Sequence, residues 1–292
     1  MTKETKNKVS STALGTCIMR STSYYEKKPC YKSDDFIAPK VIPSFLHVMA
    51  KYNILRSILK KAVFKVPGIY EYVIARTKFI DEIFKCSLGN VEQVLIFGAG
   101  FDSRAIRFSQ ELKNAKLFEV DAPPTQQAKI NRLREKYIDF PSNLNFISID
   151  FNKESLVEKL NQAGFQNDRV CLFLLEGLTY YLDDAAIDST LRLISACSAK
   201  GSLLVFDYAA AEAVGEEIVI DERRVKELHK SLAKAGEKPG FMLKEKIQSF
   251  LDKYNFELVE EVTSVSLANR YFGQANFALS AQKFRIVKAI KK

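Results

Sequence analysis

The glycine pair of Gly98-Ala99-Gly100 directly follows the short apolar run Val94-Leu95-Ile96-Phe97. A run of this kind is typical of a strand that is buried on both faces of a parallel sheet. Ligands of open α/β sheets bind where such strands end, and glycine lets the backbone approach a ligand closely. Glycine also serves strand-to-helix turns for geometry alone, so the pattern indicates either a ligand loop or a plain turn.

A carboxylate follows at the end of the next apolar run, in Glu119-Val120-Asp121, about 20 residues beyond the glycines. In this position a carboxylate accepts hydrogen bonds from the ribose hydroxyls of an adenosine cofactor. An N-cap of the following helix is the alternative, because Ala122-Pro123 and a helix-prone stretch come next. We expect Asp121 to bind ribose.

The identity of the cofactor depends on what the glycine loop lacks. A dinucleotide site calls for a third glycine where this chain has Ser103, and no G-x-x-x-x-G-K-[ST] pattern occurs for a nucleoside triphosphate. S-adenosylmethionine carries no phosphate and does not need that glycine. The sequence therefore favours S-adenosylmethionine over a nicotinamide cofactor.

The elements that must position these residues alternate between strand and helix. After residues 94–97, further strand-like runs span 116–120, 145–149, 170–175, 202–206, 256–262 and 277–287. Helix-prone stretches lie at 45–64, 69–84, 103–112, 124–138, 153–163, 184–198 and 243–254. The alternation predicts an α/β fold with a doubly wound, mostly parallel, seven-stranded sheet of the Rossmann-like kind.

The same patterns divide the chain. Residues 1–40 are polar and without clear periodicity, and we predict a partly mobile arm there. Residues 41–292 form a single domain, with a helical lead-in at 41–88 and a Rossmann-like core at 89–208. A helical cap inserted at 209–241 precedes a C-terminal helix and strands at 242–292. Within the lead-in, an apolar stripe that includes Ile54 and Ile58 is expected to be buried.

Composition excludes several classes of site and partner. The 292 residues carry a net charge of +9, but no aromatic-studded basic stretch, so nucleic acid is not expected as a partner. Two distant histidines and five scattered cysteines without a CxxC pair predict no metal site, reduced thiols and a cytoplasmic protein. No apolar run approaches the roughly 18–20 residues of a membrane span, so no membrane partner is expected.

Several blocks of the sequence resemble the leucine carboxyl methyltransferase family and its bacterial and archaeal small-molecule relatives. The glycine block, Gly98-Ala99-Gly100-Phe101-Asp102-Ser103-Arg104, is similar to the family's G-A-G-x-D-[ST]-R. The other blocks start at Arg76, Phe118, Leu175, Phe206 and Gly236, as RTKFID, FEVD, LEGLTYYL, FDY and GEKPGF. The resemblance implies a class I, S-adenosylmethionine-dependent methyltransferase.

The resemblance also implies roles for individual residues. Arg76 looks like the arginine that holds the methionine carboxylate of the cofactor, with a surface ion pair to Glu71 or Asp81 as the alternative. Gly98, Ala99 and Gly100 would lie beneath the cofactor, and Asp121 would bind its ribose.

Two further strand ends carry residues of the same pattern. Asp150 and Phe151 resemble the pair that frames the adenine, with a plain turn as the alternative. Glu176 looks like the carboxylate that faces the methionyl amino group, with a helix-start carboxylate as the alternative. Asp102 and Arg104 are expected to brace the glycine loop.

Tyr181 resembles a tyrosine near the transferred methyl group, and Tyr180 lies beside it. Aromatic side chains at such a position are equally often part of the core. Tyr181 and Arg76 are the candidate catalytic residues.

The expected methyl acceptor depends on which side chains could act as a general base. A carboxylate, with a reference pKa of about 4, is ionised at neutral pH and needs no base, whereas a hydroxyl usually calls for a histidine or a metal. Neither His47 nor His229 lies in a strand-end motif. We therefore expect O-methylation of a carboxylate, on an acidic small molecule or a protein C-terminus. Methylation of a hydroxyl, with His229 of the cap as base, is the alternative.

Two other enzyme classes share this kind of sheet. A nicotinamide oxidoreductase is disfavoured by Ser103 and by the block Leu175-Glu176-Gly177. An amino-directed nucleic-acid methyltransferase generally carries [DN]-P-P-[FY] after the fourth strand, where this chain has Leu-Glu-Gly-Leu.

Overall fold

One mixed sheet runs through the molecule in the computed structural model, which describes residues 8–64, 66–87, 89–150, 153–210, 240–273 and 283–292. Within them the strands are β1 (Gln93–Phe97), β2 (Lys116–Asp121), β3 (Leu144–Ser148), β4 (Cys171–Leu175), β5 (Leu203–Ala210), β6 (Met242–Leu243), β7 (Phe256–Thr263) and β8 (Phe284–Lys291). Their order is β3-β2-β1-β4-β5-β8-β7, and the two-residue β6 pairs with β5. Only β8 runs antiparallel to its neighbours, β5 and β7. The predicted doubly wound, mostly parallel sheet is confirmed.

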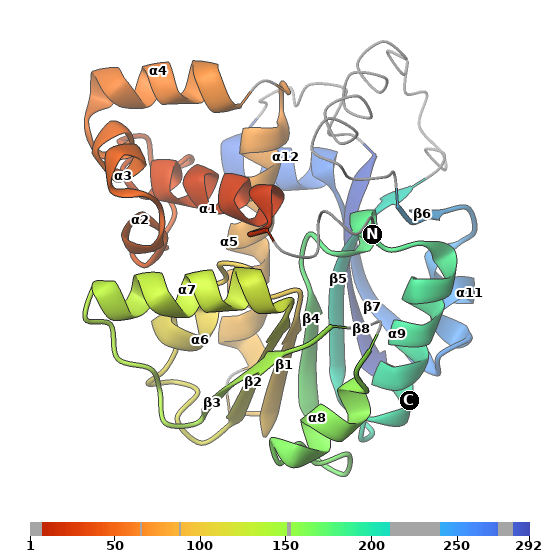
Figure 1. Ribbon diagram of the computed structural model, residues 1–292. Coiled ribbons are helices and arrows are strands. Elements are labelled where there is room, and N and C mark those ends of the chain that lie inside the picture. The colour runs from red at the N-terminus through yellow and green to blue at the C-terminus, as the bar shows by residue number, and fades with distance from the viewer. Residues whose placement is uncertain (1–7, 65, 88, 151–152, 211–239, 274–282) are drawn as a thin grey trace.

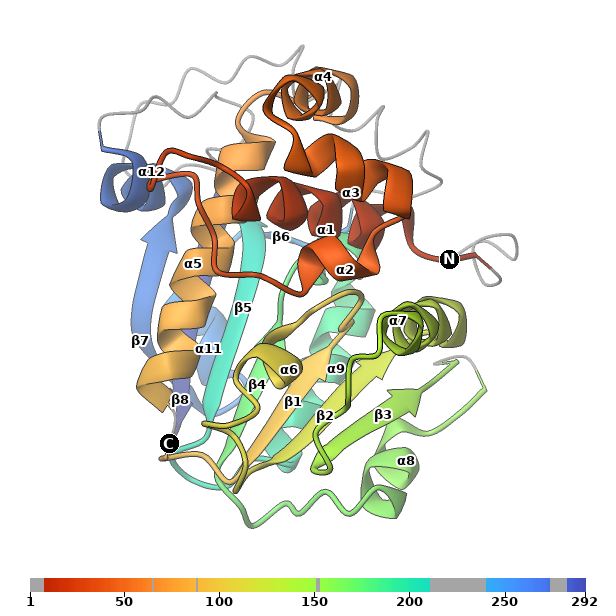
Figure 2. The same ribbon diagram turned by 90° about the vertical axis from the view of Figure 1, so that its left-hand side faces the viewer.

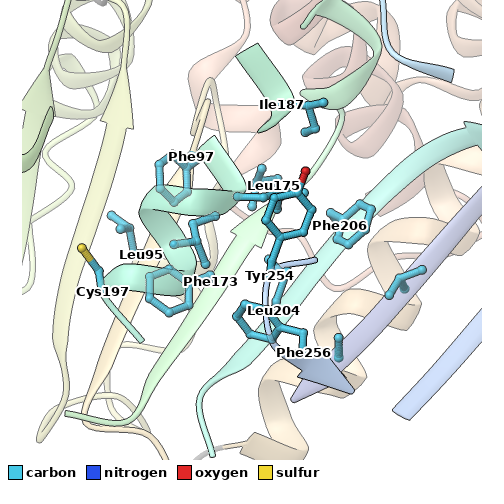
Figure 3. Close-up of a cluster of buried hydrophobic side chains, with 14 of the residues drawn as sticks. Leu95, Phe97, Phe173, Leu175, Ile187, Cys197, Leu204, Phe206, Tyr254 and Phe256 are labelled. Atoms are coloured by element: carbon cyan, nitrogen blue, oxygen red, sulfur yellow. The ribbon is translucent and has the colours of Figure 1, made fainter. Parts of the chain in front are cut away.

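Burial on both faces explains why the central strands read as continuous apolar runs. In β1, Leu95 and Phe97 join the core on one face, and Val94 and Ile96 join the core on the other. Figure 3 shows the first of these cores, where strand side chains meet Ile187 of the covering helix layer. Each side chain of such a strand is removed from water, which is the main stabilising contribution of the sheet.

Helices cover the two faces of the sheet (Figures 1 and 2). The face that carries Leu95 packs against α8 (Leu156–Gln162), α9 (Asp184–Ala196) and α11 (Ile247–Asp252). The opposite face packs against α5 (Ile69–Ser87), α6 (Arg104–Arg107) and α12 (Ser264–Phe272). The helix α7 (Pro123–Glu135) connects β2 to β3. Helix α6 is shorter than the predicted 103–112.

The amino-terminal residues differ from the prediction of an arm. They form α1 (Ser11–Tyr24) and α2 (Ala38–Val41), and Cys17, Ile18 and Ala38 belong to a buried cluster with Phe101 of the glycine loop. Helix α1 starts at the N-cap Ser10, whose side chain accepts a hydrogen bond from the backbone N–H of Ala13. Residues 8–40 are thus a part of the domain built around this cluster.

The predicted helix over 45–64 is divided in two. The helices α3 (Ser44–Lys51) and α4 (Asn53–Val63) meet at Tyr52, whose backbone is extended (φ −89°, ψ 130°). This break changes the direction of the apolar stripe, because helical spacing does not continue through an extended residue. The expected burial of Ile54 and Ile58 is wrong: their side chains are 78% and 52% exposed.

The carboxyl-terminal part adds one helix that the sequence patterns did not predict. Helix α12 begins after Thr263, whose hydroxyl accepts from the backbone N–H of Ser266, and Gly273 follows its last residue. The predicted cap at 209–241 lies largely outside the described residues, and β5 continues to Ala210, past the predicted start of the cap. None of the described helices is long and apolar enough to cross a membrane.

Candidate active site

The carboxyl ends of β1, β2, β4 and β5 meet at one edge of the sheet. Strand β1 lies between β2 and β4, so the strand order reverses there. The helices α1 and α2 lie over this edge (Figure 2). A crevice at the point of reversal is where ligands of open α/β sheets bind.

The glycine loop and Asp121 form one unit at this edge. Gly98 and Gly100 have positive φ angles of 58° and 50°, in the left-handed region that favours glycine. The Gly100 N–H donates to Oδ2 of Asp121, and the Ala122 N–H donates to Oδ1 at 2.6 Å. Burial raises the pKa of Asp121, and these two backbone donors partly offset that effect. The N-cap alternative is not supported, since the N-cap of α7 is Ala122 and no side chain caps that helix.

Arg76 joins two strand ends through buried ion pairs. Its Nε lies 3.0 Å from Oε1 of Glu176, which follows β4, and its Nη1 lies 2.5 Å from Oδ2 of Asp207 in β5. Burial works to raise the pKa of Glu176, but Arg104 and Arg76 outweigh it and hold that pKa below its usual range. Asp207 also accepts from the Gly177 N–H at 2.6 Å. The alternative of a surface pair with Glu71 or Asp81 is therefore wrong.

Arg104 links the glycine loop to the same cluster, as its expected bracing role requires. Its Nη1 donates to Oε2 of Glu176 at 2.6 Å and to Asp102, and its Nε donates to Asp81 at 2.7 Å. The Nη2 atom is buried and has no hydrogen-bond partner within the described parts of the chain. A buried donor without a partner is costly, so this atom is suited to an acceptor that a ligand brings.

The two neighbouring tyrosines lie on a short 3₁₀ helix, η2 (Thr179–Tyr181). The hydroxyl of Tyr180 donates to Oδ2 of Asp207 at 3.0 Å and lies 3.2 Å from the hydroxyl of Tyr72. The pKa values of Tyr72 and Tyr180 are raised well above 10 by burial and by Asp207. Tyr181, the predicted catalytic tyrosine, is half-buried beside them. The hydroxyl of Tyr72 donates to the same Oδ2 atom of Asp207 at 3.4 Å, so both Tyr180 and Tyr72 are tied to the ion-pair cluster.

The predicted adenine pair is described only in part. Asp150 follows β3, and its backbone carbonyl accepts from the N–H groups of Lys153 and Glu154 in a turn. Its carboxylate is about 28% exposed, with Lys153 Nζ at 3.9 Å. Phe151 lies outside the described residues.

Two residues of this edge come from the segment that was predicted to be an arm. Asp35 is fully buried and accepts from Arg20 at 2.9 Å and from Ser103 at 2.8 Å. Arg20 also donates to the carbonyl oxygen of Phe101 at 2.7 Å. The N-terminal segment therefore contacts the glycine loop directly, through Arg20 and Asp35. The available signal was the helical spacing of Ala13, Leu14, Cys17 and Ile18 after Ser10.

The donors and acceptors fit the cofactor that the sequence indicates. An amino-acid zwitterion needs a cation and a carboxylate side by side, which Arg76 and Glu176 provide, and a ribose needs the acceptor provided by Asp121. The left-handed glycines keep the loop free of side chains: a Cβ on Gly100 would lie 4.0 Å from Oδ2 of Asp121. The described residues contain no group of three side chains suited to a metal ion.

Comparisons with known proteins identify the family of this chain. The family model described as leucine carboxyl methyltransferase matches residues 15–195. The chain is 28% identical over 227 residues to the putative S-adenosyl-L-methionine-dependent methyltransferase YktD of Bacillus subtilis, covering 75% of this chain and 72% of that protein. It is 31% identical over 146 residues to a putative S-adenosyl-L-methionine-dependent methyltransferase of Mycobacteroides abscessus, covering 50% of this chain and 48% of that one.

Solved structures support the fold. A putative methyltransferase from Thermobifida fusca superposes with a TM-score of 0.59 at 16% identity, covering 98% of this chain and 96% of that one. A family match over residues 15–195 exceeds half of the chain, and it includes Arg76, the glycine loop, Asp121 and Glu176. The chain therefore belongs to the leucine carboxyl methyltransferase family and is an S-adenosylmethionine-dependent methyltransferase.

Proposed function

We propose that this enzyme methylates a carboxylate of an acidic acceptor. The ion-pair cluster of Arg76, Arg104, Glu176 and Asp207, together with Asp121 and the glycine loop, holds the cofactor without providing a base. The cofactor carries the methyl group on a sulfonium sulfur. Transfer of the methyl group leaves this sulfur as a neutral thioether. The enzyme then has to bring the acceptor oxygen and the methyl group into line and exclude water.

Each site residue has a defined part in this proposal. Arg76 takes the methionine carboxylate of the cofactor and Glu176 its ammonium group, in exchange for their present ion pair. Asp121 accepts from the ribose hydroxyls, with both of its oxygens already oriented by the Gly100 and Ala122 N–H groups. The loop from Gly98 through Ala99 to Gly100 lies beneath the cofactor.

Three further residues complete the assignment. Asp150 and Phe151 frame the adenine. Tyr181 lies near the methyl group, on the 3₁₀ helix that follows Glu176 and Gly177.

The observation that carries the carboxylate assignment is the lack of a proton acceptor in the described cluster. The Tyr72 and Tyr180 hydroxyls stay protonated at neutral pH, because burial and Asp207 raise their pKa values. Glu176 and Asp207 are both occupied by guanidinium groups. A carboxylate acceptor is already ionised and needs no base, whereas a hydroxyl acceptor would need a base to remove its proton.

Burial raises the pKa of Glu119 to about 7, a value suited to a base. Its side chain is buried on β2, two residues before Asp121, and lies 2.5 Å from Lys129 Nζ. In that position it is bound to its own counter-ion, away from the strand end, so the mechanism does not use it.

The net charge of +9 suits an acidic acceptor, whether a small acid or a protein C-terminus. Electrostatic attraction of this kind weakens with salt. The apparent affinity for the acceptor should therefore fall as ionic strength rises, and an affinity independent of salt would remove this part of the proposal.

The cofactor site is tested by titrating the purified protein with S-adenosylhomocysteine, with NAD and NADP in parallel. Saturable binding of the first alone, lost in Asp121→Ala while the circular dichroism spectrum is unchanged, supports the assigned site. Binding that survives this substitution would move the ribose site elsewhere.

The acceptor is tested by screening carboxylic acids and C-terminal peptides for methyl esters that base hydrolyses. A carboxylate-directed enzyme should show a nearly constant rate between about pH 6 and 8, since the acceptor is ionised throughout. Base-stable methyl ethers, and a rate that rises with pH through this range, would instead indicate a hydroxyl acceptor.

We place the activity in the cytoplasm. The five cysteines are all unpaired, and three of them are buried. Unpaired thiols are typical of a reducing compartment.

A further inference from the structure

The outer surface of α3 and α4 is apolar and exposed. It is formed by Phe45, Val48, Tyr52, Ile54, Ile58 and Val63, which we call the α3–α4 face. These are six of the eleven large hydrophobic side chains that are exposed among the described residues, so exposure of this kind is concentrated in one segment. Concentrated exposed apolar surface marks a site of interaction rather than ordinary surface.

The position of α4 is fixed from its inner side. Leu59 is buried in the amino-terminal cluster, and the buried Arg56 donates to the Ala50 carbonyl oxygen at 3.0 Å and to Asn53 Oδ1 at 3.0 Å. These contacts explain how α4 is held against α3 without any use of Ile54 or Ile58. Within the described parts of the chain, the apolar outer side chains are exposed and available to a partner.

The charged residues of the segment that forms this face have a single sign. Residues 36–70 contain no aspartate or glutamate, but six lysine and arginine residues. Of these, Lys40, Lys51 and Lys61 are exposed, whereas Arg56 is buried and Lys60 pairs with Glu26. A symmetric contact between two copies would set these cations against each other, which disfavours a second copy as the occupant.

We propose that the α3–α4 face binds the surface of anionic phospholipid membranes. An amphipathic helix of this kind lies in the plane of the interface, with its apolar side chains below the headgroups and its lysines beside the lipid phosphates. Tyr52 supplies an amphipathic ring that favours this boundary, and Phe45 adds to the apolar side. The sequence-based expectation of no membrane partner rested on the lack of a span, which does not bear on peripheral binding.

The face lies at the end of the molecule that carries the candidate active site (Figures 1 and 2). Docking through α3 and α4 would bring the carboxyl edge of the sheet toward the membrane. The enzyme would then meet acceptors that are concentrated at an anionic surface. The proposal does not depend on whether the acceptor is a carboxylate.

The test is cosedimentation of the full-length protein with phosphatidylcholine vesicles, with and without phosphatidylglycerol, at low and high salt. We expect binding only to the anionic vesicles, and more of it at low salt. The double variant Lys51→Glu/Lys61→Glu should weaken binding about tenfold or more, because each basic residue near such a surface contributes separately. The variant Ile54→Ser/Ile58→Ser should weaken it at either salt concentration.

Two matched variants control for charge and for apolar area. Lys113→Glu/Lys200→Glu changes two exposed lysines that precede β2 and β5, at the opposite end of the sheet. Val157→Ser/Val259→Ser changes two exposed apolar residues on α8 and β7. Loss of binding in the α3–α4 variants alone supports the proposal.

The other outcomes overturn it. A loss in Lys113→Glu/Lys200→Glu equal to that in Lys51→Glu/Lys61→Glu would mean that net charge, and not this face, binds the vesicles. A loss in Val157→Ser/Val259→Ser equal to that in Ile54→Ser/Ile58→Ser would mean that exposed apolar area in general does so. The protein could instead self-associate without binding vesicles. If Ile54→Ser/Ile58→Ser then made it monomeric, the face would be an interface between copies. A monomer that stays in the supernatant would show that the face binds no membrane.

Discussion

The carboxyl edge of the sheet and the α3–α4 face use basic side chains in opposite ways. At the edge, Arg76 is 4% exposed and contacts two carboxylates, and Arg104 contacts three. On the face, Lys51 and Lys61 are exposed, and the surrounding sequence has no carboxylate to pair with them. The first arrangement cancels charge within the protein, and the second leaves it available.

The difference follows from the cost of removing charge from water. A buried guanidinium is tolerated only when carboxylates surround it, and those contacts fix its direction, as a binding site for a zwitterion requires. An exposed lysine has little desolvation cost and acts at longer range, with no fixed geometry. The two regions should therefore respond very differently to the loss of a charged or an apolar group.

The largest expected effect is at Asp207. The substitution Asp207→Ala leaves Arg76 with one buried partner instead of two and removes the acceptor of the Gly177 N–H. We expect it to lower the free energy of unfolding in urea by about 3–5 kcal/mol. The control Glu245→Ala removes an exposed ion pair with Lys253, and about 0–1 kcal/mol is expected there.

If Asp207→Ala cannot be purified, Asp207→Asn keeps the volume and should still destabilise the protein more than Glu245→Ala. Equal losses in the two regions would contradict the distinction between them.

A smaller effect is expected from Asp102 in acid. Burial works to raise its pKa, but Arg104, with help from Lys129 and the Arg104 N–H, lowers the pKa to about 2. A lowered carboxyl pKa contributes stability that is complete above the unfolded value of about 4 and is lost as the pH falls toward 2. That contribution is on the order of 2 kcal/mol. Glu119, with a pKa raised by burial to about 7, titrates outside this window.

Urea unfolding of the wild type and of Asp102→Asn between pH 5 and pH 2 measures this contribution. The wild type should lose more stability over the window than the variant, whose side chain has no proton to gain. Parallel curves for the two proteins would assign the acid sensitivity to other carboxylates.

The glycine loop should show an effect on binding rather than on folding alone. Gly100→Ala places a Cβ 3.1 Å from the Cβ of Ala13 and imposes a left-handed backbone on alanine. We expect the loop to shift in the free protein and so relieve about 1–2 kcal/mol of this strain. Binding must then restore the loop, which should lower the affinity for S-adenosylhomocysteine roughly tenfold. Gly201→Ala, also left-handed but with no atom within 4 Å of the added Cβ, should leave the affinity unchanged. Calorimetric titration distinguishes them.

The parallel core was predictable because its signals are local. Each central strand is a short apolar run buried on both faces, and the glycine loop and Asp121 follow such runs directly. A strand end fixes where the next residue points, so spacing along the chain was enough to gather Gly98, Asp121 and Glu176 at one edge.

The contacts that complete the site were not predictable, because they join distant positions. Asp35 reaches Ser103, 68 residues away, and Asp207 reaches Arg76, 131 residues away. No periodicity marks an isolated charged residue as buried. Asp207 belongs to the FDY block that resembles the family, but its place as the shared partner of Arg76, Gly177 and Tyr180 appears only in three dimensions.

The α3–α4 segment shows a different limit. A stripe at helical spacing indicates that one side is apolar but not what covers it, and the extended backbone at Tyr52 redirects α4. Two residues of the predicted stripe, Ile54 and Ile58, therefore face outward.

The smallest expected effect is the sharpest check on that segment. Ile54 is 78% exposed, so Ile54→Ser should change the free energy of unfolding by no more than about 0.5 kcal/mol. Leu59, on the inner side of the same helix, is 1% exposed, and Leu59→Ala should cost about 2–5 kcal/mol. The two variants share one helix, so their difference isolates burial from helix propensity. A cost above about 1 kcal/mol for Ile54→Ser would mean that the protein itself covers this side chain, and the face would lose its role as a surface for partners.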